Sequence, residues 1–150
     1  DDPLLAESAA PDVLARIRES FENRSNEAAE TAGASYAAME RSLKKLADAG
    51  ARLVLGADTG VQDHLQGYTE HHELELIATA GLSPADVIKA ATSVPAEVLG
   101  VDTGLLAAGR RADFLVLDAN PMYGISNTRQ ISAVYLGGER VDRDGMRAAW

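Results

Sequence analysis

The sequence predicts an α/β fold, in which amphipathic helices accompany one buried strand and a β-rich segment follows. Two observations carry this prediction. Up to about residue 102, most apolar side chains recur at three- and four-residue steps, which is typical of one face of a helix. From Gly104 onward, short apolar runs alternate with glycine and Asn-Pro, which is typical of strands and turns. We therefore expect two regions, residues 1–103 and residues 104–150.

The composition excludes several classes of function. With 46% hydrophobic and 25% charged residues over 150 positions, the chain is suited to fold around one modest core. A net charge of -9 with only 5% aromatic residues argues against nucleic acid and against an anionic membrane surface as partners. No stretch approaches the roughly 20 apolar residues of a membrane span. The absence of cysteine excludes disulfides and thiolate metal sites, but it leaves the location of a soluble protein, cytoplasmic or exported, unknown.

Two helices are expected before the buried strand, which we place at residues 51–55. The first runs from Pro11 to about Glu22, because Pro11 suits a first helical position and the apolar residues after it share one face. The second runs from about Ala29 to Asp48, and Gly50 lies where a C-terminal cap belongs. Five apolar side chains form a seam on this second helix, which predicts packing in a core: Ala32, Tyr36, Met39, Leu43 and Leu46.

Three shorter helices are expected after the strand. One covers about residues 69–80. The next begins after Ser83, whose side chain can cap it, with Pro84 in its first turn. Pro95 lies in the first turn of a last short helix, which Gly100 closes.

The C-terminal region predicts strands joined by tight turns. Residues 112–118 and 131–136 are apolar runs bounded by turn residues. Gly137-Gly138 is suited to a two-residue hairpin turn, so residues 139–141 should form a strand that pairs with the preceding one.

Residues 51–55, with the sequence Ala-Arg-Leu-Val-Leu, predict a buried strand of a parallel sheet, because they form a short apolar run between Gly50 and Gly56. Asp58 would then stand at the carboxyl end of this strand, the edge from which α/β barrels project their catalytic groups. An aspartate in a turn or at the cap of the next helix is the alternative.

A single strand cannot form a parallel sheet, and such a sheet needs cover on both faces. We therefore expect the chain to be part of something larger, either a fragment that lacks an N-terminal barrel or a subunit that completes its fold with a partner. Expressed alone, it should self-associate or aggregate through the apolar faces that the missing strands should cover.

Eight segments between about Gly50 and Val141 carry a family resemblance by their consistent order. They are residues 50–67, Glu73-Leu74, residues 80–84, Ala90-Ala91-Thr92, Pro95-Ala96, Leu99-Gly100, residues 104–118 and Asn120-Pro121. Together they resemble the C-terminal third of the metal-dependent amidohydrolase superfamily, with its imidazolonepropionase-like and Xaa-Pro dipeptidase-like members. The resemblance implies the C-terminal fragment of a (β/α)8 barrel in residues 1–103, followed by part of a small β-sandwich in residues 104–150.

In that family the aspartate that closes the eighth strand is a metal ligand, and it also carries a proton from the metal-bound water to the leaving amine. Asp58 inherits both roles by its place in the motif. One or two divalent ions, expected to be zinc, would lower the pKa of bound water toward ~7 and polarise the scissile carbonyl. His64 matches a substrate-facing histidine of those relatives. A surface loop histidine is the alternative, since Leu65 stands where the relatives usually carry glycine.

The other polar residues that follow Asp58 are interpreted as structural. His71 and His72 are adjacent, so on a helix their side chains diverge by about 100° and make a poor chelating pair. Asp63, Glu70 and Glu73 are interpreted as solvated or capping residues.

The resemblance implies hydrolysis of a carbon–nitrogen bond in a small-molecule or dipeptide-like substrate, such as an amide, a dipeptide or a cyclic amide. The family's His-x-His pair, its bridging lysine or glutamate and two further histidines are absent, because the three histidines of this chain all follow Asp58. A catalytic zinc has at least three protein ligands, so the chain alone is expected to be inactive. The alternative is a free-standing, non-catalytic subunit with a structural or interaction role.

Overall fold

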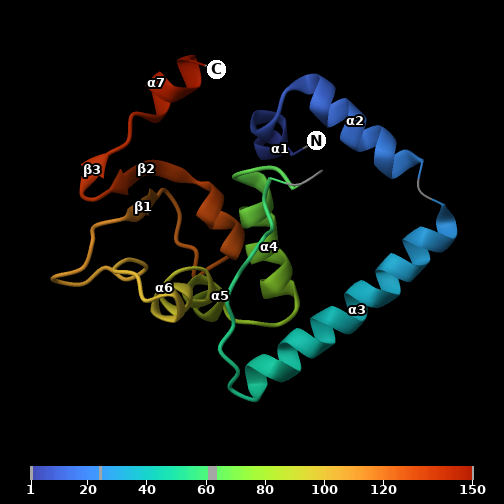
Figure 1. Ribbon diagram of the computed structural model, residues 1–150, viewed down its shortest axis with the longest axis horizontal. Coiled ribbons are helices and arrows are strands. Elements are labelled where there is room, and N and C mark those ends of the chain that lie inside the picture. Colours follow the sequence, from blue (N-terminus) through green and yellow to red (C-terminus); the bar gives the residue numbers. More distant parts are fainter. Residues whose placement is uncertain (1, 24, 61–63, 150) are drawn as a thin grey trace. The chain divides into compact units, whose positions relative to one another are not determined.

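The computed structural model describes residues 2–23, 25–60 and 64–149 and has a mixed helical and β fold (Figure 1). The chain divides into two compact units. The first unit consists of residues 1–51 and 56–82, and the second unit consists of residues 52–55 and 83–150. The predicted division into a C-terminal barrel fragment, residues 1–103, and a β-sandwich segment, residues 104–150, stays a prediction.

The first unit is helical over most of its described length. Its helices are α1 (Pro3–Ser8), α2 (Pro11–Glu22), α3 (Asn26–Asp48) and α4 (Tyr68–Thr79). This confirms the three helices predicted for this part of the chain. Helix α1 was not predicted; the Asp2 carboxylate caps it by accepting a 2.9 Å hydrogen bond from the backbone N–H of Leu4. Over the described residues, no helix combines the length and the apolar character that crossing a membrane requires.

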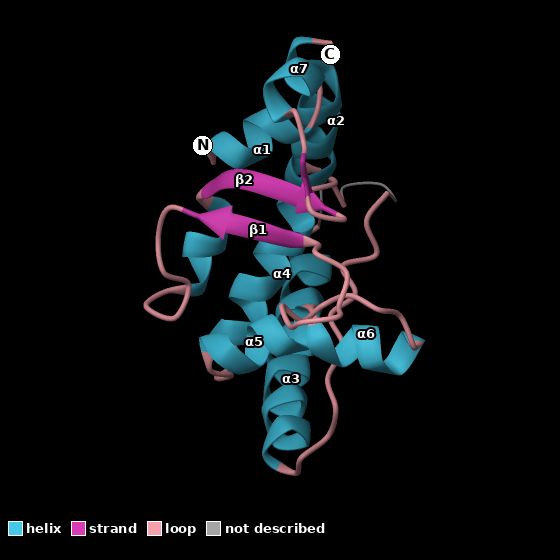
Figure 2. Cartoon of the chain, turned by 90° about the vertical axis from the view of Figure 1, so that its left-hand side faces the viewer, coloured by secondary structure: helices cyan, strands magenta, loops and turns pink. Residues whose placement is uncertain are grey.

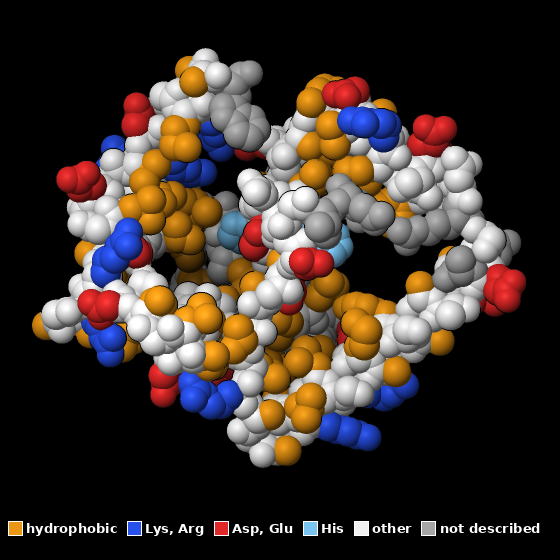
Figure 3. Space-filling model, in the orientation of Figure 1, with side chains coloured by type: hydrophobic (Ala, Val, Ile, Leu, Met, Phe, Trp, Pro, Cys, Tyr) orange, Lys and Arg blue, Asp and Glu red, His pale blue; other side chains and the backbone are white. Residues whose placement is uncertain are grey.

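The apolar seam of α3 lies largely open in this structure. Met39 is 64% exposed and Leu46 is 53% exposed, and hydrophobic side chains are visible on the surface along α3 (Figure 3). None of the described side chains of the first unit is buried. The described residues of this unit therefore form no buried core, and they do not provide the packing that the seam predicts.

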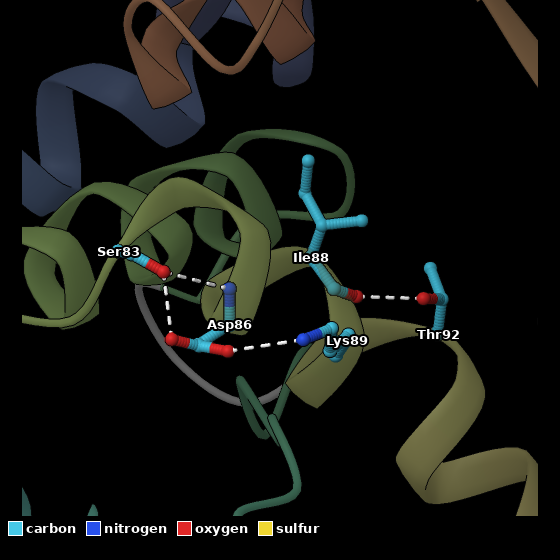
Figure 4. A network of polar contacts seen from close by, with 5 residues as sticks. All are labelled: Ser83, Asp86, Ile88, Lys89 and Thr92. Atoms are coloured by element: carbon cyan, nitrogen blue, oxygen red, sulfur yellow. Dashed lines mark hydrogen bonds and ion pairs between the residues drawn. The ribbon is translucent and has the colours of Figure 1, made fainter.

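The second unit contains two helices, and local signals mark the start of one and the end of the other. Helix α5 (Pro84–Ala91) has Ser83 at its N-cap, and the Ser83 hydroxyl oxygen accepts a 3.2 Å hydrogen bond from the backbone N–H of Asp86 (Figure 4). Helix α6 (Ser93–Leu99) ends at Gly100 in the left-handed conformation, with φ at 68°. Both predictions are confirmed. The small core of this unit consists of Val87, Ala90, Ala96 and Ile125.

The second unit also holds a three-stranded antiparallel sheet in the order β1-β2-β3 (Figure 2). Its strands are β1 (Phe114–Leu117), β2 (Ile131–Leu136) and β3 (Glu139–Arg140), with the short helices η1 (Ile125–Arg129) and α7 (Arg143–Ala148) beside them in sequence. Leu136 pairs with Glu139 across the predicted Gly137-Gly138 turn, and both glycines have positive φ, as a tight hairpin requires. The strands are those predicted, although a second sheet that would make a sandwich is not seen among the described residues.

The predicted strand at residues 51–55 is not formed. This segment takes no part in the sheet, and its backbone is held instead by a 2.8 Å hydrogen bond from the Leu55 N–H to the Ala90 carbonyl. The physical reason is that a parallel strand needs neighbouring strands for its hydrogen bonds, and none of the described residues supplies one.

Candidate functional site

The candidate site is the segment that carries Asp58, which we call the Asp58 loop and define by its described residues, 56–60 and 64–67. Asp58 is exposed, and its φ of 49° lies in the left-handed region. Among the described non-glycine residues it is the one with positive φ. Its carboxylate makes no hydrogen bond or ion pair with a described residue. Asp58 is thus held in a backbone conformation that is unfavourable for most side chains, with its carboxylate uncommitted.

His64, the second predicted site residue, folds back onto the backbone of the same loop. Its Nδ1 lies 3.0 Å from the carbonyl oxygen of Ala57 and 3.2 Å from that of Asp58. Both partners are acceptors, so Nδ1 carries the proton and donates. In the neutral ring Nε2 is then an acceptor, and it makes no hydrogen bond with a described residue. The structure therefore brings Asp58 and His64 together through the backbone, and it leaves one nitrogen of His64 for another partner.

Glu70, on the first turn of α4, ties the Asp58 loop to that helix. One carboxylate oxygen accepts a short hydrogen bond from the Thr59 hydroxyl, and the other accepts a 2.8 Å hydrogen bond from the backbone N–H of Gly67. Burial acts to raise the pKa of Glu70, but these hydrogen bonds, its own backbone N–H and the nearby charge of His71 together hold that pKa below its ordinary value. Glu70 is therefore held as a carboxylate.

Two further contacts hold the described part of the loop. Glu73, one turn along α4, lies with Oε1 3.4 Å from the backbone N–H of Gly56, and the Gly60 N–H donates a 3.0 Å hydrogen bond to the His64 carbonyl. Glu70 and Glu73 were interpreted as solvated or capping residues, and Glu70 does cap α4. Its contact with Thr59 was not predicted. The available signal was only the spacing of Glu70 three residues after Gly67, which is that of a capping box.

The remaining polar residues near the loop lie on helix α4 or outside the described part. His72 stacks on Tyr68, with ring centroids 5.7 Å apart, and its Nδ1 lies 4.0 Å from Glu75. These contacts fit the structural role predicted for it. Asp63 lies outside the described residues.

The residues of this site fit one ligand position of a metal centre. The uncommitted carboxylate of Asp58 is a donor that zinc and other divalent ions accept. Within the described ranges, no group of three or more His, Asp or Glu side chains could hold a metal ion. A metal site built around Asp58 therefore needs further ligands.

Comparison with known proteins places the chain in a family. The amidohydrolase family matches residues 15–141. The imidazolonepropionase of Deinococcus radiodurans is 31% identical over 102 residues, which cover 65% of this chain and 26% of that protein.

Solved structures agree with this match. A putative prolidase from Bifidobacterium longum is 38% identical over 70% of this chain and 26% of its own, with a TM-score of 0.62. Bottromycin amidohydrolase is 25% identical over 99% of this chain and 35% of its own, with a TM-score of 0.76. The chain thus spans about a quarter to a third of the length of these relatives. Since the family match covers most of its length, this chain belongs to the amidohydrolase family and has the fold of part of an amidohydrolase barrel.

Proposed function

We propose that this chain is the C-terminal part of a metal-dependent amidohydrolase that hydrolyses a carbon–nitrogen bond. The family's members are hydrolases that act on such bonds. The observation that carries the proposal is the state of Asp58, whose carboxylate is exposed and uncommitted while the polar groups around it are engaged in holding the loop.

Asp58 has two roles in this proposal. Its carboxylate is one ligand of a divalent ion, with the other ligands supplied from outside the described residues, and zinc is the ion we expect. When bound, such an ion supplies activated water and polarises the scissile carbonyl. In the proposed reaction the Asp58 carboxylate would accept a proton from the attacking water and return it to the leaving amine, so that one carboxylate would serve as general base and then as general acid.

His64 is proposed as a substrate contact. Because its Nδ1 proton is used by the carbonyls of Ala57 and Asp58, the ring is held in one orientation and Nε2 faces any further partner as an acceptor when neutral. Such a nitrogen suits an N–H or O–H group of an amide or amino-acid substrate. In this proposal His64 binds substrate through Nε2, which can accept a hydrogen bond because the proton is on Nδ1.

The substrate class proposed is a small amide, a dipeptide or a cyclic amide. The names of two relatives, an imidazolonepropionase and a putative prolidase, support a class that includes both cyclic amides and dipeptides. Substrate choice in α/β barrels is set by loops from all the strands, and the Asp58 loop is one of them.

The test is the hydrolysis of a panel of Xaa-Pro dipeptides, N-acyl amino acids and cyclic amides by the full-length protein loaded with zinc, and by its Asp58→Asn variant. Asparagine keeps the shape of the side chain but cannot carry the proton. We expect kcat/KM to fall by at least ~100-fold, with no loss of folded structure.

The matched control is Asp118→Asn, because Asp118 is an exposed carboxylate just beyond β1 that makes no hydrogen bond or ion pair with a described residue. It should change kcat/KM by less than about twofold. Near-normal turnover by Asp58→Asn would show that Asp58 has neither role. A native protein that folds with a partner, binds no zinc and hydrolyses none of the panel would favour the non-catalytic alternative.

A further inference from the structure

We propose that Thr59 and Glu70 are positioning residues for Asp58, and that the hydrogen bond between them fixes the backbone of the Asp58 loop to the start of helix α4. The inference rests on the proposed function, since it concerns how the carboxylate of Asp58 is presented to a divalent ion. It assigns neither Thr59 nor Glu70 a contact with substrate.

The backbone conformation of Asp58 needs support from surrounding contacts. A left-handed conformation is unfavourable for an L-residue, although aspartate tolerates it better than most residues. Gly56 and Gly60, near Asp58 on either side, add backbone freedom. A backbone of this kind keeps one conformation only where surrounding contacts over-determine it.

Thr59 has the side chain that is best placed to support the backbone of Asp58. It directly follows Asp58 in sequence, and its hydroxyl donates to Glu70, a residue of helix α4. The His64 ring also contacts the backbone of Asp58, but it belongs to the same loop and so does not anchor that loop to a helix. The Glu73 contact also reaches α4, but at 3.4 Å it is long for a hydrogen bond, and its partner is Gly56 and not a residue next to Asp58.

Both carboxylate oxygens of Glu70 are engaged in hydrogen bonds with the loop. One carboxylate oxygen is taken by Thr59 and the other by the N–H of Gly67. Glu70 is therefore poorly suited to act as a metal ligand or as a base itself. From its position on α4, Glu70 instead links two residues of the loop, with one carboxylate oxygen bound to Thr59 and the other to the N-cap residue Gly67.

The simpler alternative is that Glu70 only caps α4 and has no role in positioning Asp58. Variants of Thr59 can separate these two roles. Replacing Thr59 with valine removes the hydroxyl, keeps the size of the side chain and leaves the contact between Glu70 and Gly67 in place. Replacing Thr59 with serine keeps the hydroxyl. The pair therefore tests the anchor without disturbing the helix cap.

The experiment measures the zinc affinity of the full-length protein by competition with a chelator, and the visible absorption spectrum of its cobalt(II) form. We expect Thr59→Val to weaken zinc binding by about tenfold and to alter the cobalt spectrum, because supporting contacts around a ligand are worth about 10–100-fold in affinity. Thr59→Ser should stay within about twofold of the parent protein by the same reasoning.

Glu70 gives a second pair of variants. Glu70→Ala should weaken zinc binding at least as much as Thr59→Val does, and adding Thr59→Val to it should change little, because both remove the same link. Glu70→Gln should rescue most of the affinity. The glutamine carbonyl can accept from Gly67, while its NH₂ group donates to the Thr59 hydroxyl oxygen.

Ser83→Ala is the control for general destabilisation, because it removes the N-cap of α5 outside the first unit. It should leave zinc affinity unchanged. Equal zinc affinities of Thr59→Val and the parent protein would overturn the inference. So would equal losses of affinity in Thr59→Val and Thr59→Ser, or a loss of the same size in Ser83→Ala.

The Asp58→Asn variant separates a failure of this inference from a failure of the proposed function. If Asp58→Asn also binds zinc normally, the role of Asp58 is wrong and the inference falls with it; if Asp58→Asn alone loses zinc, only the inference is wrong.

Discussion

The backbone of Asp58 gives a prediction about stability at the scale of a single residue. Its φ of 49° favours glycine over any residue with a Cβ atom. We expect Asp58→Gly to be more stable than Asp58→Ala by about 1 kcal/mol, because both variants lack the carboxylate and differ mainly in the cost of the left-handed conformation. The measurement is chemical denaturation of the metal-free, full-length protein.

Neither variant should hydrolyse substrate, so any gain in stability at this position comes with a loss of function. Equal stability of the glycine and alanine variants would mean that the left-handed conformation of Asp58 is not kept in the full-length protein.

Because of the carboxylate of Asp113, we expect the free energy of unfolding to depend on pH. Its carboxylate accepts hydrogen bonds from the Gly137 N–H at 2.7 Å, from Thr103 at 3.1 Å and from Arg111 at 3.0 Å. The bond from the Gly137 backbone is the largest cause that holds the pKa of Asp113 below its usual value, with partial burial opposing it and Thr103 and Arg111 adding to it. Because the folded pKa is the lower one, this stabilisation is complete above the unfolded pKa of about 3.9 and is lost as the pH falls through the folded pKa.

Asp113→Asn tests this dependence, since asparagine keeps the shape but does not titrate. The difference in thermal midpoint between the parent protein and Asp113→Asn should be largest above about pH 5 and should shrink as the pH falls below about 4. Asp118→Asn, at an exposed carboxylate, serves as the control and should show a much smaller change over the same range. A difference between the parent protein and Asp113→Asn that stays constant with pH would contradict the role given to the ionised carboxylate.

At the residue scale the sequence predicts Asp58 as a site residue, and this stays a prediction, whereas the contacts around Asp58 could not be predicted. Asp58 is marked by a short motif, an acidic residue after an apolar run and before glycine. Thr59 and Glu70 lie eleven positions apart, and their contact depends on how the loop folds back onto α4. No local pattern encodes such a contact, so the cap that Glu70 provides could be predicted but its hydrogen bond with Thr59 could not.

At the scale of elements, Gly104 fixes how the segment after α6 passes that helix. A Cβ atom at Gly104 would lie 2.4 Å from the Thr92 carbonyl oxygen and 2.9 Å from the Ala96 Cβ, and the φ of Gly104 is 76°. Alanine would therefore suffer both a backbone penalty and a steric overlap with backbone that cannot turn aside. We expect Gly104→Ala to lower the free energy of unfolding by about 2–4 kcal/mol, measured by chemical denaturation.

Gly109→Ala is the matched control, because Gly109 has a φ of 84° but open space where its Cβ would lie. It should cost only about 1–2 kcal/mol, the penalty of the backbone alone. If the two variants lost the same stability, the close approach of Gly104 to Thr92 would not exist in solution.

The elements that the sequence predicted are those whose signals are local. Helices α2 to α6 follow from helical spacing and from caps such as Ser83, and the hairpin follows from Gly137-Gly138. The short helices α1 and α7 were missed because six residues carry little periodic signal. The strand expected at residues 51–55 failed for the opposite reason: its sequence suits a strand, but strands exist only with partners.

At the scale of the whole molecule, the uncovered apolar seam of α3 predicts self-association of this chain on its own. Tyr36, Met39 and Leu46 are exposed, and none of the described residues of the first unit is buried. We expect the isolated chain to sediment as a concentration-dependent mixture of oligomers in analytical ultracentrifugation. Met39→Glu should shift that mixture toward the monomer, because it places a charge in the seam.

Ala34→Glu is the control, since it adds the same charge to α3 about 140° away from Met39 around the helix. It should leave the association unchanged. A monomeric isolated chain that unfolds in one cooperative transition would contradict the view that the seam needs a further layer of structure.

The central claim is that this chain closes a larger metal-dependent barrel to which Asp58 contributes a ligand. The measurement that tests it most directly is to read the coding sequence upstream of Asp1 in its source. The account predicts an in-frame His-x-His motif, followed by a lysine or glutamate and then by two further histidines, which would supply the ligands that the described residues lack. A start codon immediately before Asp1 would contradict it, and the search for function would then turn to a partner protein.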